Sequence, residues 1–511
     1  MKNFLLLILF FSLNFLIMGE NLNMPYSEQY REQYHYSPLK GWANDPNGLV
    51  YFNKQWHMFY QYYPFDSKWG PMHWGHAISK DLIHWEEKDI ALFPENNSFI
   101  FSGSAVVDKN NTSGLFNYTN QGGLILIYTT HSDKKGHVIE QQSLAYSLDD
   151  GVTWIKYNEG KPIVSKEMDS LSKPYAFRDP KIFFSDEANK WMMIVAGGPV
   201  RFFSSNNLID WKVEGTNSEI DTECPDFFKM KVDGSDIYKW VLTYSGRYYQ
   251  IGDFKNINGL WKFVPLSKKL EMNFGKDSYA GQSFFDAPDN RRLMINWMNN
   301  WEYANDIGSI TKSYNGQFTL INELKLAKSG NNYMLYQSPI KEYESLRKNC
   351  EIDENFILNN KSIVFDTISS NNCETIIEFK PDDSVSNIGV IFKNKINKTV
   401  IDYNCIEEEI SMNRVNSGVS PNSSNKFLNK YNTYLEKLEN GTIKLHIFID
   451  SSSIEAYINN GISVGSLLIF PEYKYDNIEI YSTNGFSEVK IKLYSLNNIW
   501  DKDNMNIKNK D

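Results

Sequence analysis

Four segments of this 511-residue chain share one pattern, in which a polar turn runs into a strand that carries a tryptophan. The tryptophans are Trp85, Trp154, Trp211 and Trp261, and they recur at intervals of about 50 to 70 residues. A repeat of this length is typical of the four-stranded blades of a β-propeller. The pattern therefore predicts a propeller, although Asp-rich turns before aromatic strands also occur in other β proteins.

Aromatic residues are abundant, with 31 Tyr, 32 Phe and 13 Trp. They favour strands over helices, so the composition predicts an all-β protein, and the length predicts two domains. The net charge of −10 and the sequence pI near 5.5 disfavour nucleic acid and anionic membranes as partners, because both repel a protein of this sign. A neutral small molecule is the expected ligand.

The N-terminus has the features of a secretory signal peptide, assigned to residues 1–19. Lys2 precedes an apolar run from Phe4 to Met18, and Gly19 stands near the expected cleavage point. The alternative is an uncleaved anchor, for which the run is short. The expected location is secreted or extracellular, with cell-surface or vacuolar/lysosomal placement as variants. Eight sequons predict a glycoprotein: Asn96, Asn110, Asn111, Asn117, Asn360, Asn397, Asn422 and Asn440.

The cysteines and histidines do not form a metal pattern. Four cysteines lack the C-x-x-C spacing of zinc sites and redox dithiols: Cys224, Cys350, Cys373 and Cys405. One disulfide is expected among the last three, between a pair left open, and the first would be a lone thiol. His73 and His76 would face opposite sides of a strand, which makes them poor joint ligands. The sequence predicts no metal or other cofactor and leaves the oligomeric state open.

The strand pattern changes near residue 330. Residues 30–330 carry the tryptophan repeat and are assigned to the propeller. Residues 331–348 are expected to form a linker with a short helical piece from Ile340 to Leu346. Residues 349–498 alternate again without the tryptophan repeat, as in Thr375–Phe379, which favours a β-sandwich.

Three acidic residues stand in rigid local frames. Asp45 precedes Pro-Asn-Gly, Asp179 precedes Pro, and Glu223 precedes Cys-Pro, so a proline fixes the backbone just beyond each carboxylate. For Asp45 the frame predicts a turn at a strand edge. For each acid taken alone, a place in a solvent-facing turn explains the local sequence equally well. In a propeller, however, the corresponding blade ends converge on the central channel, where the three would meet.

Hydrolysis of a glycosidic bond needs two carboxylates, one at the anomeric carbon and one that protonates the leaving oxygen. Glu223 is the better proton donor, because its Cys, Pro and Phe neighbours would desolvate it. Asp45 lies between asparagines that favour its ionised form. Arg178 would keep Asp179 charged, which suits a ligand-holding role.

A set of motifs in characteristic order and spacing carries a resemblance along nearly the whole chain. The motifs are Trp42–Gly48, Gln61–Pro64, Trp69–His76, Phe101–Ser104, Phe177–Pro180, Glu223–Pro225 and, in the C-terminal part, Ile449–Tyr457. On these motifs the chain resembles glycoside hydrolase family 32, the invertase and inulinase group of β-fructofuranosidases. The resemblance implies a five-bladed β-propeller followed by a C-terminal β-sandwich, one blade more than the repeat shows.

The resemblance also implies residue roles. Asp45 is expected to be the nucleophile, Glu223 the general acid and base, and Asp179 the transition-state stabiliser, in a retaining double displacement through a covalent fructosyl-enzyme. The implied substrate is sucrose, with raffinose and fructans as further candidates. The alternatives are a fructosyltransferase and a non-catalytic sugar-binding propeller.

Further residues are expected to contact the sugar around the three acids. They are Asn44, Gln61, Trp69, Ser102, Arg178 and Trp301. For the two tryptophans the competing interpretation is core packing, which is the commoner role of Trp in β proteins.

Overall fold

The computed structural model describes residues 25–95, 98–117, 122–168, 176–196, 198–330, 332–366, 372–422 and 424–500. The residues assigned to a signal peptide, and Asn96, lie outside this part. Strands dominate, and the helical elements are short: η1 (Tyr157–Gly160), η2 (Lys166–Met168), η3 (Pro288–Asn290), α1 (Ala304–Thr311), η4 (Lys341–Leu346) and α2 (Ser424–Phe427). Over the described ranges, every helix falls short of the length and apolarity that a bilayer crossing requires.

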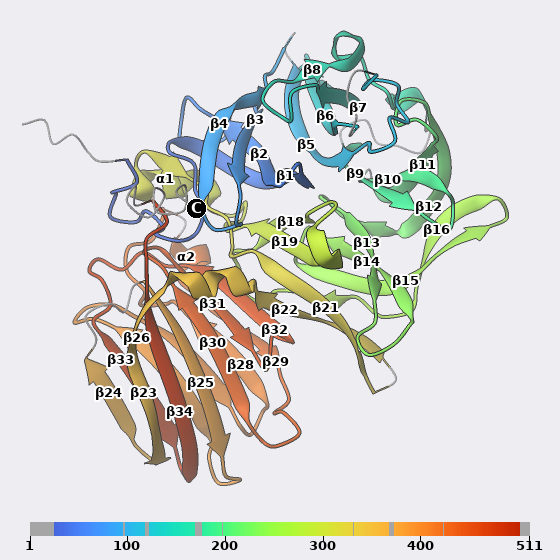
Figure 1. Cartoon of the computed structure of the whole chain (residues 1–511). Coiled ribbons are helices and arrows are strands. Elements are labelled where there is room, and N and C mark those ends of the chain that lie inside the picture. Colours follow the sequence, from blue (N-terminus) through green and yellow to red (C-terminus); the bar gives the residue numbers. More distant parts are fainter. Residues whose placement is uncertain are drawn as a thin grey trace, which may run out of the picture.

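Five sheets follow one another between residues 41 and 339 (Figure 1). The first contains β1 (Gly41–Phe52), β2 (Gln55–Tyr63), β3 (His73–Ser79), β4 (Trp85–Leu92) and the short β20 (Tyr314–Asn315). The second contains β5 (Ser98–Val107), β6 (Leu124–Lys134), β7 (His137–Ser147) and β8 (Ile155–Lys156). The third contains β9 (Arg178–Ser185), β10 (Lys190–Ala196), β11 (Pro199–Ser205) and β12 (Trp211–Asp221).

The last two of these sheets complete the N-terminal part. The fourth contains β13 (Asp226–Lys231), β14 (Tyr238–Tyr244), β15 (Tyr248–Ile257), β16 (Leu260–Pro265) and β17 (Leu270–Glu271). The fifth contains β18 (Tyr279–Ser283), β19 (Arg292–Trp297), β21 (Asn322–Ser329) and β22 (Asn332–Pro339).

The first strands of the five sheets form a closed ring of contacts, in the order β1, β5, β9, β13, β18 and back to β1. The late strand β20 pairs in parallel with β1, so the chain returns to the sheet in which it began. This arrangement is a β-propeller, as the tryptophan repeat predicts. It places the N-terminal ends of five strands around one central region.

The tryptophan repeat marks the same turn in four of the sheets, between the third and fourth strands. In the first sheet, Oδ1 of Asp81 accepts the backbone N–H groups of Ile83 (3.0 Å) and His84 (2.8 Å). The third sheet repeats this turn with an Asn at position 207. Such Asx turns explain the polar residue of the repeat. The connection between β21 and β22 contains no tryptophan, so the repeat cannot be recognised in the sequence of the fifth sheet.

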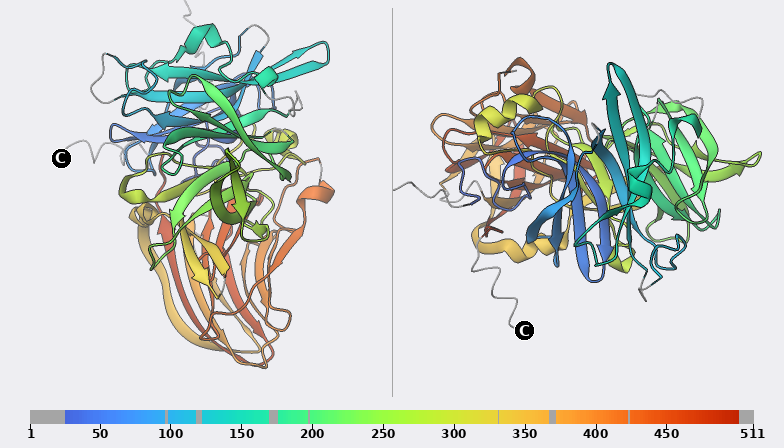
Figure 2. Two further views of the ribbon diagram at one scale, coloured as in Figure 1. Left: turned by 90° about the vertical axis from the view of Figure 1, so that its right-hand side faces the viewer. Right: turned by 90° about the horizontal axis from the view of Figure 1, so that it is seen from above.

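Two six-stranded sheets form the C-terminal β-sandwich, which lies against the propeller near its fifth sheet (Figures 1 and 2). One contains β23 (Arg347–Asn359), β34 (Phe486–Leu496), β25 (Cys373–Pro381), β30 (Ile443–Ile449), β31 (Ser453–Ile458) and β32 (Ser463–Leu468). The other contains β24 (Ser362–Asp366), β33 (Asn477–Thr483), β26 (Asn387–Lys393), β27 (Lys398–Asn404), β28 (Glu409–Asn413) and β29 (Lys430–Tyr434). Inward-facing aliphatic side chains of both sheets form one core.

The predicted linker at residues 331–348 is wrong in its first half. Residues 332–339 form β22, which pairs with β21. The reason is that Leu335 packs into the core between the fourth and fifth sheets, with Tyr333 against it. The 3₁₀ helix η4 coincides with the expected helical piece, and β23 begins directly after it.

The expected disulfide is also absent, because all four cysteines are free. Cys350 on β23 and Cys373 on β25 flank the intervening strand β34. Strands separated by one other strand lie about 9.6 Å apart, whereas the Cα atoms of a disulfide lie within about 7 Å. Cys405 follows β27 in the opposite sheet.

A buried ion pair joins the two domains. Nη1 of Arg414, from the sandwich, lies 2.5 Å from Oδ2 of Asp277, from the propeller, and both side chains are fully buried. The Tyr303 hydroxyl and the backbone N–H of Leu468 also donate to this carboxylate. The buried carboxylate thus has a counter-charge and further hydrogen-bond donors in place of water.

Replacing Asp277 by Ala is expected to lower the free energy of unfolding by about 3–5 kcal/mol, because the guanidinium of Arg414 stays buried without its counter-charge. Equilibrium unfolding in urea measures the change. The control is Lys276→Ala, which breaks the neighbouring exposed pair with Glu302 and should cost less than about 1 kcal/mol. Similar losses in the two variants would contradict the role of the buried pair.

Candidate active site

One cavity of about 520 Å³ collects all nine side chains that the sequence singles out. They come from the first three sheets, from the connection into the fourth, and from the segment after β19. The residues are Asn44, Asp45, Gln61, Trp69, Ser102, Arg178, Asp179, Glu223 and Trp301. The structure thus brings together every residue predicted to act at the site.

Asp45 reaches the cavity from a bulge inside β1, not from the predicted turn at a strand edge. The register of β1 against β2 shifts between Ala43 and Pro46, so one extra residue is accommodated while the strand continues. A bulge of this kind re-aims side chains, and Pro46 fits it because a bulge relaxes the demand for a ladder N–H group. The turn-forming residues of this motif therefore shape a strand.

The other inner strands use related devices. Ser102 lies at a register shift between β5 and β6. Asp179 and Cys224 adopt left-handed backbone conformations, with φ of 60° and 43°. These conformations are costly for residues with a Cβ atom and are concentrated at functional sites. Each turns a polar group towards the centre of the propeller.

Asp45 is surrounded by hydrogen-bond donors. Its carboxylate accepts from the Ser102 hydroxyl (2.6 Å), from the Asn44 amide (2.9 Å) and from the Cys224 thiol (3.4 Å). Burial raises the pKa of Asp45 above its usual value, and the bonds from Ser102 and Asn44 oppose the rise. Asn44 contacts the carboxylate and favours its ionised form, as expected, but burial changes the pKa of Asp45 more.

Asp179 differs from expectation in its charge. Its Oδ2 accepts the backbone N–H of Cys224 at 2.9 Å and lies 3.8 Å from Nε of Arg178. Burial raises the pKa of Asp179 to about 7, although Arg178 lowers it. Arg178 thus favours the charged form of Asp179, as the sequence predicts, but burial outweighs this effect. Neighbours in sequence do not reveal how deeply a carboxylate is buried.

Glu223 lies at the open side of the cavity, with 42% of its side chain exposed. Nη2 of Arg178 donates to Oε1, and the Tyr279 hydroxyl donates to Oε2 at 2.5 Å. The desolvation expected from its sequence neighbours is not found. Phe227 points into the core of the fourth sheet, and the thiol of Cys224 points to the other two acids.

The two predicted tryptophans are rim residues, not core residues. Trp69 is 38% and Trp301 43% exposed. Trp301 stacks on the buried Trp42 with ring centroids 5.9 Å apart, which fixes its plane. An exposed, fixed indole beside buried polar groups is suited to contact the apolar face of a sugar.

Several lining residues have no distinguishing signal in the sequence. They are His131, Val138, Glu140, Tyr279 and Asn305. His131 and Glu140 are cross-strand partners in the β6–β7 hairpin, and no proline frames either of them. Only the convergence of the strands shows that they reach the cavity.

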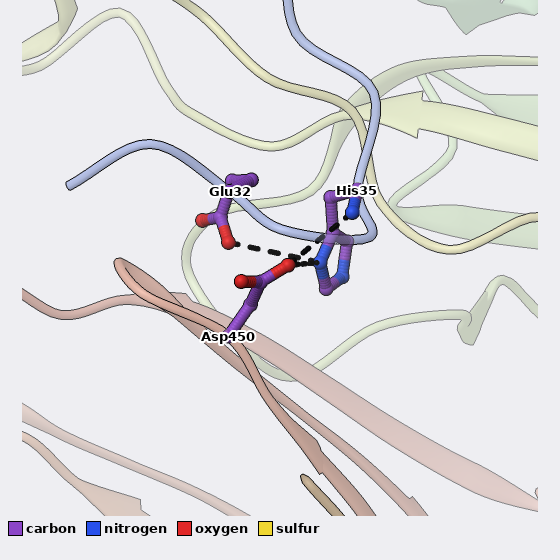
Figure 3. Close-up of side chains that lie close together, drawn as sticks. All are labelled: Glu32, His35 and Asp450. Carbon is purple, nitrogen blue, oxygen red and sulfur yellow. Dashed lines mark hydrogen bonds and ion pairs between the residues drawn. The ribbon is translucent and has the colours of Figure 1, made fainter. Parts of the chain in front are cut away.

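One cluster of metal-ligand types occurs in the part of the chain that the structure describes, and it lies outside the cavity. Glu32 and His35, before β1, face Asp450 at the end of β30 (Figure 3). The His35 ring contacts Oδ2 of Asp450 through Nδ1 (2.9 Å) and Oε1 of Glu455 through Nε2 (3.1 Å). Burial alone would lower the pKa of His35, but these two carboxylates raise it to about 10. The charged imidazole thus pairs with two carboxylates of the sandwich.

Comparison with known proteins gives matches over both domains. The profile of the Glycosyl hydrolases family 32 N-terminal domain matches residues 35–339, and that of the Glycosyl hydrolases family 32 C terminal matches residues 342–498. The crystal structure of exo-inulinase from Aspergillus awamori has a TM-score of 0.84 at 30% identity, with 93% of this chain and 100% of that one covered.

Two bacterial relatives match at higher identity. A fructan beta-fructosidase of Streptococcus mutans is 39% identical over 505 residues, which are 94% of this chain and 34% of that protein. A levanase of Bacillus subtilis is 37% identical over 509 residues, which are 93% of this chain and 72% of that protein. The chain thus spans about a third of the Streptococcus protein.

Asp179→Asn is expected to raise the free energy of unfolding by roughly 1–2 kcal/mol near pH 8 and to change it little near pH 4. The folded protein keeps the Asp179 proton up to about pH 7, whereas the unfolded chain loses it near pH 4. Stability therefore falls as pH rises between these values, and Asn removes the loss. Unfolding at both pH values measures it, with Asp236→Asn, at a fully exposed acid, as control. Equal effects at both pH values would contradict the assignment.

Proposed function

The chain belongs to glycosyl hydrolase family 32, and from this premise we propose that it is a β-fructofuranosidase that hydrolyses terminal non-reducing β-D-fructofuranosides. The observation that carries the proposal is the meeting of Asp45, Asp179 and Glu223 in one cavity. Sucrose and raffinose are the proposed small substrates. The names fructan beta-fructosidase, levanase and exo-inulinase among the relatives support fructans as further substrates.

Asp45 and Glu223 have the surroundings that a double displacement requires. Asp45 attacks the anomeric carbon, and its three donors hold one carboxylate geometry. Glu223 protonates the leaving oxygen and, in the second step, takes a proton from the water that releases fructose. Its exposed position gives water a route to the covalent intermediate. The configuration at the anomeric carbon is retained.

Asp179 and Gln61 are proposed to grip the fructosyl unit. Asp179 is buried beside Asp45 and is held by the backbone N–H of Cys224. Nε2 of Gln61 is buried, lines the cavity and has no partner among the described residues. A sugar hydroxyl would satisfy this amide, since a buried donor without an acceptor is costly.

The protein is proposed to act outside the cell. The N-terminal apolar run and the sequons support this location, and relatives from Aspergillus are named extracellular exo-inulinases. Asn397 is a poor glycosylation site, because it is buried and accepts the backbone N–H of Glu472. The sequon residues at Asn110, Asn117, Asn360, Asn422 and Asn440 are exposed.

Asp45→Asn and Glu223→Gln are each expected to reduce fructose release by at least about 100-fold, because one removes the nucleophile and the other the proton donor. Fructose is assayed with sucrose, raffinose, inulin and levan. Asp210→Asn, in an exposed turn of the third sheet, is the control and should keep wild-type rates. Wild-type protein that releases fructose from none of the four sugars would refute the proposed function.

Trp301→Ala is expected to raise KM about tenfold with a smaller effect on kcat, since the indole contacts bound sugar in the ground state and the transition state alike. Initial rates on sucrose separate the two constants. Trp261→Ala, on the outer strand β16, removes an indole that does not line the cavity and should leave KM unchanged. An unchanged KM in Trp301→Ala would exclude the sugar contact.

A further inference from the structure

Glu140 is a buried carboxylate at the site to which the proposed mechanism gives no task. Its side chain is 2% exposed, and Oε2 lies 3.3 Å from Nη1 of Arg178. The same guanidinium reaches Asp179 through Nε and Glu223 through Nη2. One cation is thus shared by three carboxylates on three different sheets or their connections.

The β6–β7 hairpin holds Glu140 rigidly. His131, directly opposite on β6, contacts the second carboxylate oxygen of Glu140 through Nδ1 at 3.0 Å. The imidazole stacks on Phe101 with ring centroids 4.1 Å apart. Both oxygens of Glu140 are therefore engaged, one by His131 and one by Arg178. The carboxylate therefore has a fixed place beside Nη1 of the guanidinium.

This placement affects the proton on Glu223. A cation in contact with a carboxylate favours the ionised form, whereas the first step of the reaction needs Glu223 protonated. The negative charge of Glu140 partly neutralises the charge of Arg178, and it also acts on Glu223 directly as a nearby negative charge. Both effects favour the protonated form of Glu223. Without Glu140, the guanidinium would lose one of the three carboxylates that it contacts.

We propose that Glu140 is a positioning residue that sets, through Arg178, the highest pH at which Glu223 still carries the proton that it gives to the leaving sugar. This inference rests on the proposed function. The groups that face Glu223 come from all the elements around it: Asp45 of β1, Arg178 and Asp179 of β9, Cys224 beside it and Tyr279 of β18. Glu140 differs from them in acting on Glu223 through the cation of Arg178.

The test is the pH dependence of kcat/KM for sucrose in Glu140→Gln, which removes the charge and keeps the shape. The high-pH limb of the bell-shaped profile reports the acid of the free enzyme. We expect this limb to move about one pH unit towards acid. Above the limb kcat/KM should fall about tenfold, and at low pH it should stay near wild type. The low-pH limb should move less, since Asp45 is held by Ser102, Asn44 and Cys224.

Three matched variants separate this effect from a structural one. Glu140→Asp keeps the charge and should restore most of the wild-type limb. Glu214→Gln makes the same change at a buried carboxylate outside the cavity, on β12, and should leave the limb in place. His131→Phe keeps the ring stack and removes the other partner of Glu140. Glu140 then interacts more strongly with Arg178 and neutralises more of its charge. Because this favours the protonated form of Glu223, the high-pH limb should move towards higher pH.

The outcomes are distinguishable. Opposite limb shifts in Glu140→Gln and His131→Phe support the proposal. A Glu140→Gln profile that is merely scaled down, with its limb in place, overturns it. If Glu140→Gln does not fold, an unmoved or acid-shifted limb in His131→Phe overturns it instead. If the wild-type protein releases no fructose, the proposed function is refuted. If the wild-type protein gives a bell-shaped pH profile and none of the variants shifts its limb, only the role proposed for Glu140 is refuted.

Discussion

The sharing of one guanidinium by three carboxylates, two of them buried, is the constraint on which the site depends. Asp45 and Asp179 are buried close to Glu223, and like charges at such distances cannot all be ionised without a cation among them. Arg178 supplies that cation from the same strand as Asp179. The ring of inner strands explains how residues far apart in sequence come this close. Their bulges and left-handed residues explain why polar side chains, not core residues, point inwards.

Local patterns predict much of this architecture. The Asx turns around Asp81 and Asn207 and the tryptophans after them reveal four of the five sheets, and the proline-framed acids lead to the cavity. The failures share one cause, since burial and convergence are properties of the folded chain. Adjacent residues suggest a charged Asp179 and a desolvated Glu223, whereas burial raises the pKa of Asp179 to about 7 and the side chain of Glu223 is 42% exposed. Glu140 has an ordinary strand sequence around it and gains its meaning only from Arg178.

The two domains divide their tasks. Among the described residues, those that line the cavity lie between positions 44 and 305, and none belongs to the sandwich. The sandwich instead binds the outside of the propeller through buried charges. Arg414 meets Asp277, and Asp450 receives His35 and the backbone N–H groups before β1. These contacts fix the entry into β1, which carries Asp45 a few residues later.

The contact between His35 and Asp450 joins residues 415 positions apart. During synthesis the segment before β1 leaves the ribosome early, and its partner carboxylate is made only after most of the chain. Until then the charges of Glu32 and His35 stay in water, because burying them without a partner is too costly. This early segment is therefore among the last to reach its final place. Such a long-range closure raises the contact order and slows folding.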